Sequence, residues 1–449
     1  MTRKGKLVSD GFDERDADAR RPATSSTKYS RSQGLSTYRQ RRRRDRVFRV
    51  VVVIVVLAIV AGGVALFGRQ LVGGKLPSFS LPSMSAPAQT KAEGKQEEVV
   101  LVEPAQISLA FAGDVVMNSA VVDSGSDYSG KYNFSHLFTH LTPEINSYDV
   151  RGLSQETNMA GNSFGYGNSV PLNAPTELGT AEVNAGFNVV LHATNHAADM
   201  GREGIHNELL WWHGNNSSIP VVGVAEPDLA GNPSLSDYVN NVYIYEKAGF
   251  KVAILNHSTE IADEDRDVVS TLDEEKIAAD VAKARELGAE MIVACPHWGN
   301  EGDSEVVEEE TQFAQIYANH GVDVVVGTHP RVLQRAEILT GPEGHQTVCY
   351  YSLGCLVSSI GTENLLGGIA ELTLTRDAQR TYHIAGAKLK PIVTNRASGT
   401  DFASYMLADY SDDISGSSWD GQSREALNER CSEILGAGYN AETYELTII

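Results

Sequence analysis

Side chains that can bind a metal ion or transfer a proton follow five hydrophobic runs of this sequence. Carboxylate, amide and neutral imidazole groups are ligands of divalent metals, and imidazole can also carry a proton. A guanidinium in the same set offers a planar cation suited to phosphate or carboxylate. We therefore predict that Asp114, Glu156, Asn195, His196, His297, His329 and Arg331 build one site for metal binding or proton transfer.

Each of these residues also has an ordinary structural interpretation. Asp114 could be a turn residue that caps a helix, Glu156 could be a solvated carboxylate, and a histidine could bond to the backbone. The prediction depends on the whole set, because loops that follow the carboxyl ends of parallel strands lie at one edge of a sheet, where ligands bind. The runs that end in these residues are 107–112, 148–153, 187–191, 291–295 and 322–326.

The segments between these runs have helical spacing or read as further strands. Apolar residues recur at helical intervals in 273–287, for example at Ile277, Val281 and Ala284. Alternating strands and helices indicate a layered α/β or α/β/α domain. The remaining predicted helices are 175–186, 202–214, 308–318 and 423–435, and the remaining strands are 242–246, 250–256, 348–353 and 369–375, the last of them antiparallel.

Charge divides unevenly along the chain. The net charge of −21 is the sum of +9 over residues 1–49, which hold 15 Lys or Arg and 6 Asp or Glu, and −30 over the rest. An acidic body of this kind excludes nucleic acid as the expected partner, because binding to phosphates needs cations.

Residues 50–68 form an uncharged run between Arg49 and Arg69. The run would span roughly 28 Å as a helix, close to the thickness of a bilayer core. The preceding arginine cluster predicts a cytoplasmic N-terminus and an extracytoplasmic body in a single-pass protein of the cell membrane. A cleaved signal peptide and a buried core helix are the alternatives, and the 49-residue leader without a clear cleavage site disfavours the first.

The expected organisation has five parts. Residues 1–49 are a disordered basic tail, 50–68 the transmembrane helix and 69–98 a flexible linker rich in Gly, Pro and Ser. Residues 99–397 form the folded domain, and the acidic extension 398–449 packs on it. The cysteines match no zinc pattern; Cys295 is predicted as a core thiol, and a bridge between Cys349 and Cys355 stays open.

Six short blocks of the sequence resemble the CapA family of bacterial poly-γ-glutamate capsule synthesis proteins, which in turn resembles calcineurin-like metallophosphoesterases. The resemblance implies a four-layer α/β/β/α domain. It also implies that Asp114 contacts one metal, that Glu156 bridges, and that Asn195, His297 and His329 hold a second metal. His196 would act beside the leaving group and Arg331 would pair with the substrate anion. The blocks are FAGDVVM at 111–117, SQET at 154–157, ATNHAADMG at 193–201, PHWGNE at 296–301, GVDVVVGTHPRVLQ at 321–334 and YSLG at 351–354.

The chain departs from the expected patterns at four positions: Val116 departs from that of two-metal phosphoesterases, and Thr194, Arg331 and Cys355 depart from that of the CapA family. Val116 and Arg331 stand where histidines are expected, Cys355 replaces an asparagine, and Thr194 replaces the first asparagine of an N-N-H motif. The departures favour one divalent ion (Mn, Fe or Zn) rather than two.

The resulting functional hypothesis is a membrane-anchored protein of capsule synthesis. It would carry out metal-dependent hydrolysis or transfer on an anionic polymer or a phosphate-containing substrate, within a capsule synthase complex. Two alternatives remain open at this point: a non-catalytic polymer-binding or assembly component, and a general exported phosphodiesterase.

Overall fold

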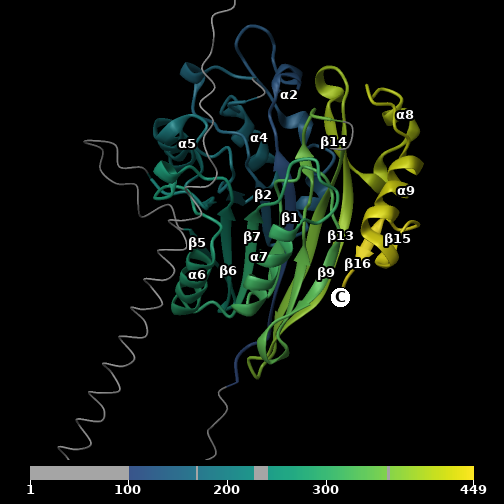
Figure 1. The fold of residues 1–449 in the computed structure, drawn as a ribbon. Helices are drawn as coiled ribbons and strands as arrows, with labels where there is room; N and C mark the ends of the chain where they lie inside the picture. The colour runs from purple at the N-terminus through teal and green to yellow at the C-terminus, as the bar shows by residue number, and fades with distance from the viewer. Residues whose placement is uncertain (1–100, 168–169, 227–240, 362–364) are drawn as a thin grey trace, which may run out of the picture. The chain divides into compact units, whose positions relative to one another are not determined.

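The computed structural model describes residues 101–167, 170–226, 241–361 and 365–449, and their strands form two sheets (Figure 1). The predicted tail, transmembrane helix and most of the linker lie outside the described residues. Within the described ranges, no helix is both long and apolar enough to cross a membrane.

The larger sheet has β1 near its centre, parallel to β2 and antiparallel to β12. The antiparallel strand predicted at 369–375 is thereby confirmed. The sheet has the order β15-β16-β13-β12-β1-β2-β3-β4, with β11 paired to β1 and β14 to β13. Its strands are β1 (Ala105–Val115), β2 (Val150–Ser154), β3 (Val189–Leu191), β4 (Val221–Val222), β11 (Cys355–Val357), β12 (Leu366–Arg376), β13 (Tyr382–Asn395), β14 (Ala403–Met406), β15 (Tyr439–Asn440) and β16 (Glu445–Thr447).

The smaller sheet has the order β5-β6-β7-β8-β10-β9. Strands β6, β7, β8 and β10 are mutually parallel, and β5 and β9 are antiparallel edges. The five runs that carry the predicted site thus divide between two sheets. The strands are β5 (Val242–Lys247), β6 (Phe250–Ser258), β7 (Met291–His297), β8 (Val324–Val326), β9 (Ala336–Thr340) and β10 (Gln346–Tyr350).

The two sheets face each other across one apolar core, and each has helices on its outer face. Alternate residues of β1, such as Leu109 and Phe111, join the core between the sheets, whereas Ala110 and Ala112 face the helices. The same alternation in β6 separates Ile254 from the outward side chains. The four-layer α/β/β/α expectation is confirmed.

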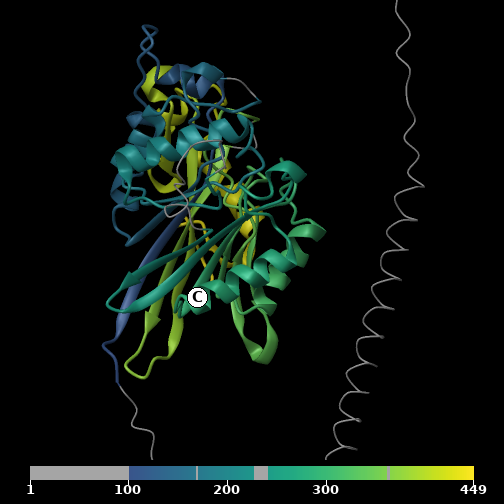
Figure 2. The ribbon, with the colours of Figure 1, turned by 90° about the vertical axis from the view of Figure 1, so that its left-hand side faces the viewer.

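The two groups of helices lie apart in both views (Figures 1 and 2). In α5, Ile205, Leu209 and Trp212 are spaced to share one buried face against the larger sheet. The larger sheet is covered by α2 (Ser119–Ser124), α3 (Thr142–Ile145), α4 (Glu177–Ala185) and α5 (Gly201–Asn216), and the smaller by α6 (Glu274–Glu286) and α7 (Glu308–Asn319).

The C-terminal residues 398–449 extend the larger sheet and belong to the same compact unit as the rest of the described chain. Strand β16 pairs with β13, and helix α9 (Arg424–Leu435) places Leu427 and Cys431 in the core between the sheets. A short helix α8 (Asp412–Ser415) precedes α9. The four cysteines are free and buried, so no bridge joins Cys349 to Cys355.

Glycines allow backbone segments to approach one another where the strands end. A Cβ atom at Gly113 would lie 1.9 Å from the carbonyl oxygen of Gly354. This contact brings the loop after β10 against the end of β1, directly beside Asp114, whose backbone N–H donates to the same oxygen at 2.9 Å.

We expect Gly113→Ala to destabilise the protein by roughly 3 kcal/mol, because backbone atoms must move to accept the methyl group. Gly214→Ala in α5 is the matched control: its Cβ would meet nothing within 4 Å, and alanine favours a helix by about 1 kcal/mol. Urea unfolding of the full chain, followed by tryptophan fluorescence, gives both values. Equal midpoints for the two variants would contradict this packing.

Candidate metal centre

The predicted site residues converge where the strands of both sheets end. Asp114 lies near the end of β1, and His297 is the last residue of β7. The others lie on the loops that follow β2, β3 and β8. Asp114, Glu156, His196, His297, His329 and Arg331 are buried, whereas Asn195 is partly exposed.

Asn256, near the end of β6, ties the loops of the two sheets together. Its Oδ1 accepts a hydrogen bond from the backbone N–H of Ala193 at 2.6 Å, and its Nδ2 donates to the carbonyl of Cys295 at 2.7 Å. These bonds fix the segment that carries Asn195 relative to the strand that carries His297.

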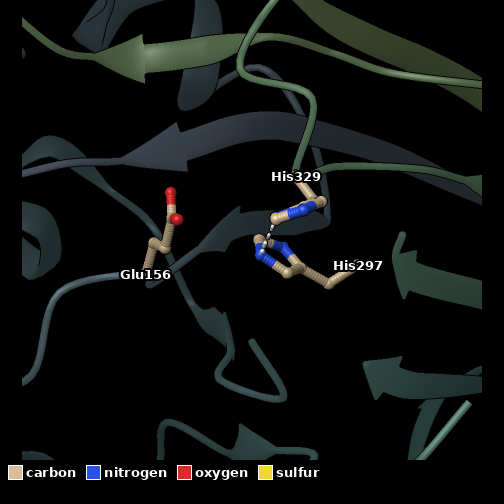
Figure 3. A group of neighbouring side chains, drawn as sticks. All are labelled: Glu156, His297 and His329. Atoms are coloured by element: carbon tan, nitrogen blue, oxygen red, sulfur yellow. Dashed lines mark hydrogen bonds between the residues drawn. The ribbon is translucent and has the colours of Figure 1, made fainter. Parts of the chain in front are cut away.

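Three electron-rich atoms meet at the centre. Nε2 of His297 lies 3.0 Å from Oδ1 of Asn195 and 3.2 Å from Nδ1 of His329. Ligand atoms about 2.0–2.1 Å from one divalent ion stand roughly 3 Å apart, so this spacing suits a shared ion. Figure 3 shows the two imidazole rings close together, with Glu156 to one side.

Both histidines are favoured in the neutral form that a metal requires. Burial, followed by electrostatic repulsion from a protonated His329 and from Arg331, holds the pKa of His297 well below its usual range, so the two rings do not both carry a proton charge. Burial also lowers the pKa of His329 to about 4. Nδ1 of His297 lies 3.0 Å from Oγ1 of Thr328. We assign the ring proton to this nitrogen, which leaves the Nε2 lone pair directed at the centre.

Asp114 contacts both histidines. Its Oδ2 accepts a hydrogen bond from the backbone N–H of His329 at 3.0 Å, and this bond helps hold His329 at a φ of 98°. Its Oδ1 has no hydrogen-bond partner and lies 3.6 Å from Nδ1 of His297. Burial and then the charge of Glu156 raise the pKa of Asp114. A buried carboxylate oxygen without a partner fits a centre that includes a cation.

Arg331 is directed into the protein and pairs with Glu156. Its Nε lies 3.1 Å from each carboxylate oxygen, and its Nη2 donates to Oε1 in a further, shorter contact. Nη2 also lies 3.1 Å from Oε1 of Glu301. Burial opposes the charge on Arg331, but the two glutamates outweigh it and raise the pKa of the guanidinium. Arg331 therefore already has carboxylate partners, whereas the sequence predicts it to pair with a substrate anion.

His196 lies between an aspartate and this guanidinium. Its Nδ1 is 2.8 Å from Oδ2 of Asp199, and its Nε2 is 3.0 Å from Nη2 of Arg331. Burial lowers its pKa, but Asp199 and Glu156 together more than compensate, so the pKa is raised.

Comparison with known proteins assigns the family. The family model described as "Bacterial capsule synthesis protein PGA_cap" matches residues 108–359, more than half of the chain. The chain belongs to this family.

Two curated relatives agree with the assignment. The "Capsule biosynthesis protein CapA" of Bacillus anthracis is 24% identical over 271 residues, covering 58% of this chain and 61% of that protein. The "PGA biosynthesis protein CapA" of Bacillus subtilis is 25% identical over 263 residues, covering 57% and 64%. The chain thus spans less than two thirds of the length of either relative.

Solved structures with similar folds include two of phosphatase type. A "novel phosphatase" from Mycoplasma pneumoniae has a TM-score of 0.39 at 13% identity, covering 65% of this chain and 95% of that one. The calcineurin-like phosphoesterase YfkN from Bacillus subtilis has a TM-score of 0.38 at 14% identity, covering 64% and 91%. Because both scores are below 0.5, the fold assignment rests on the layers and sheet order described above.

Val116 and Cys355, two positions at which the sequence departs from the expected ligand pattern, lie in an apolar environment near Asp114. Val116 and Cys355 pack together with Leu172 in a small buried cluster, and Cys355 is the register partner of Asp114 between β11 and β1. The structure therefore brings Asn195, His297 and His329 into one group of ligand atoms. A carboxylate oxygen of Glu156 lies within 4.8 Å of a ring nitrogen of each of these histidines, so the predicted ligand Glu156 borders the same group.

Sequence reasoning missed four residues that hold the site: Asp199, Asn256, Glu301 and Thr328. Asp199, Glu301 and Thr328 lie inside the blocks that resemble the family, so their motif positions were a usable signal. Asn256 ends a hydrophobic run just as the predicted ligands do, and the same rule would have selected it.

We expect Arg331→Met to lower stability by about 3–5 kcal/mol, because it leaves the Glu156 carboxylate buried without its cation. The double variant Glu156→Gln/Arg331→Met removes both charges and should remain within about 2 kcal/mol of wild type. Urea unfolding in the presence of a chelator measures both.

Lys283→Met, which breaks the exposed pair with Glu286 on α6, is the control and should change stability by less than about 1 kcal/mol. If the single and double variants were equally unstable, the buried pair would not be the cause.

Proposed function

We propose that this protein is a membrane-anchored, extracytoplasmic component of poly-γ-glutamate capsule synthesis. Its domain would carry out metal-dependent hydrolysis or transfer on an anionic substrate. Family membership supports the role in capsule synthesis. The proposed chemistry rests on the convergence of Asn195, His297 and His329, whose ligand atoms lie 3.0–3.2 Å apart. An Asp114 oxygen without a hydrogen-bond partner lies beside them.

In this proposal Asn195, His297 and His329 hold one divalent ion (Mn, Fe or Zn). When bound, such an ion would polarise a phosphoryl or acyl oxygen of the substrate. Asp114 keeps the His329 backbone in place, and Asp199 orients His196 through Nδ1. Nε2 of His196, which lies 3.0 Å from Nη2 of Arg331, is the ring nitrogen that would exchange a proton once that contact opens. The body is strongly acidic, so an anionic substrate would be attracted chiefly where the protein offers a cation.

The full chain should retain about one divalent ion after incubation with Mn²⁺, Fe²⁺ or Zn²⁺ and desalting, as measured by elemental analysis. His297→Ala and His329→Ala should lose most of it, because each removes a ligand. His383→Ala, at an exposed position of β13, is the control and should keep it. A wild-type protein that stays free of metal after all three additions would contradict the proposed metal-dependent chemistry.

The second candidate is a non-catalytic component that binds the polymer or assembles the synthase. Packing of Val116 in an apolar cluster and pairing of Arg331 with Glu156 favour it, because both positions lack the histidine of a two-metal enzyme.

Complementation of a deletion strain separates the two roles. Under the catalytic proposal, His196→Gln should reduce cell-associated polymer at least tenfold at unchanged protein level, because the variant removes the proton-carrying group. His383→Ala should restore wild-type amounts. Wild-type polymer with His196→Gln would favour the assembly role.

The membrane anchor is also part of the proposal. The full chain should sediment with membranes, resist extraction by high salt and be released by detergent, because an uncharged run such as 50–68 partitions into the bilayer. Its body should be digested by protease added to cells stripped of their wall. A body protected from that protease would contradict the predicted orientation.

A further inference from the structure

A second group of ligand-capable atoms lies beside the first. One side-chain atom each from Glu156, His196 and Glu301 can be chosen so that all lie within 4.8 Å of one another. Two of the residues are buried, and Glu301 reaches solvent. Such a group matches the donor set that a divalent cation takes, two carboxylates and an imidazole.

The space between these atoms contains a nitrogen of Arg331. Nη2 donates to Oε1 of Glu156, lies 3.0 Å from Nε2 of His196 and lies 3.1 Å from Oε1 of Glu301. One guanidinium nitrogen therefore contacts all three residues of the group. A guanidinium carries a fixed positive charge and donates hydrogen bonds toward lone pairs, which are the same lone pairs that a metal would take.

The backbone of the loop after β8 fixes the position of Arg331. Arg331 has a φ of 58°, a conformation that an L-residue adopts at a cost. The carbonyl of the preceding Pro330 accepts a hydrogen bond from Gly302 at 2.9 Å, which joins this loop to the one that carries Glu301. The guanidinium is thus built into the site and is not a surface side chain that happens to fold inward.

We propose that Arg331 is a built-in cation that fills a second metal position formed by Glu156, His196 and Glu301. The centre then accepts a single divalent ion, at Asn195, His297 and His329, and this count rests on the proposed function. Replacing Arg331 with a shorter, neutral ligand would open the second position to a divalent cation.

The test is the number of Mn²⁺ ions bound by the full chain, measured by calorimetry and elemental analysis. Wild type should bind about one ion, and Arg331→His about two, because the guanidinium is gone and an imidazole is added. Arg331→Lys, which keeps a cation on a long stem, should remain at one. Arg331→His/Glu301→Gln should return to one, because a carboxylate that belongs only to the second position is lost.

The outcomes separate this inference from the metal proposal. One ion in wild type and two in Arg331→His support both. Two ions in wild type, or one in a folded Arg331→His, overturn the role of Arg331. No ion in wild type but one in Arg331→His overturns the metal at Asn195, His297 and His329 while the role of Arg331 stands. No ion in either protein overturns both.

Electron paramagnetic resonance of Mn²⁺-loaded wild type tests the same inference if Arg331→His does not fold. An isolated ion gives the six-line spectrum of uncoupled Mn²⁺, and this is the expected result. A spin-coupled pair in wild type would show that Arg331 does not exclude a second ion.

Discussion

The buried pair of Glu156 and Arg331 is the constraint on which the site depends. Removing two charges from water is costly, and their attraction compensates only when the remaining donors and acceptors are also satisfied. Here the guanidinium meets both carboxylate oxygens, His196 and Glu301. The loops after β2, β3, β7 and β8 must therefore stay in register, because a shift of any of them would leave a buried charge without a partner.

This requirement explains why the site draws on both sheets. β1, β2 and β3 end on one side of the shared core, and β7 and β8 on the other, and the bonds of Asn256 join the two. The close approach at Gly113 then leaves Asp114 room to bond the backbone of His329. The two histidine rings meet because β7 and the loop after β8 place them side by side, and burial lowers the pKa of both.

The strands that precede the site and most site residues could be predicted from the sequence, because a hydrophobic run that ends in a polar residue marks where a buried strand ends. The long strand β13 and the shorter β4, β9, β11 and β14 were not predicted. The side-chain partners could not. Arg331 after Pro330 reads as a cation for a substrate, and only the tertiary fold places Glu156 and Glu301 around it. The sequence shows that Val116 replaces a histidine, but it does not show that Val116 packs against Leu172 and Cys355. β15 and β16 are too short to leave a pattern, and the run at 50–68 remains a prediction.

The central claim is one metal ion beside one built-in cation. Anomalous diffraction at the manganese edge from crystals soaked in Mn²⁺ tests it most directly. The account predicts a single peak among Asn195, His297 and His329, with the Arg331 guanidinium still bonded to Glu156. Two peaks, or a peak between Glu156, His196 and Glu301 with Arg331 displaced, would contradict it.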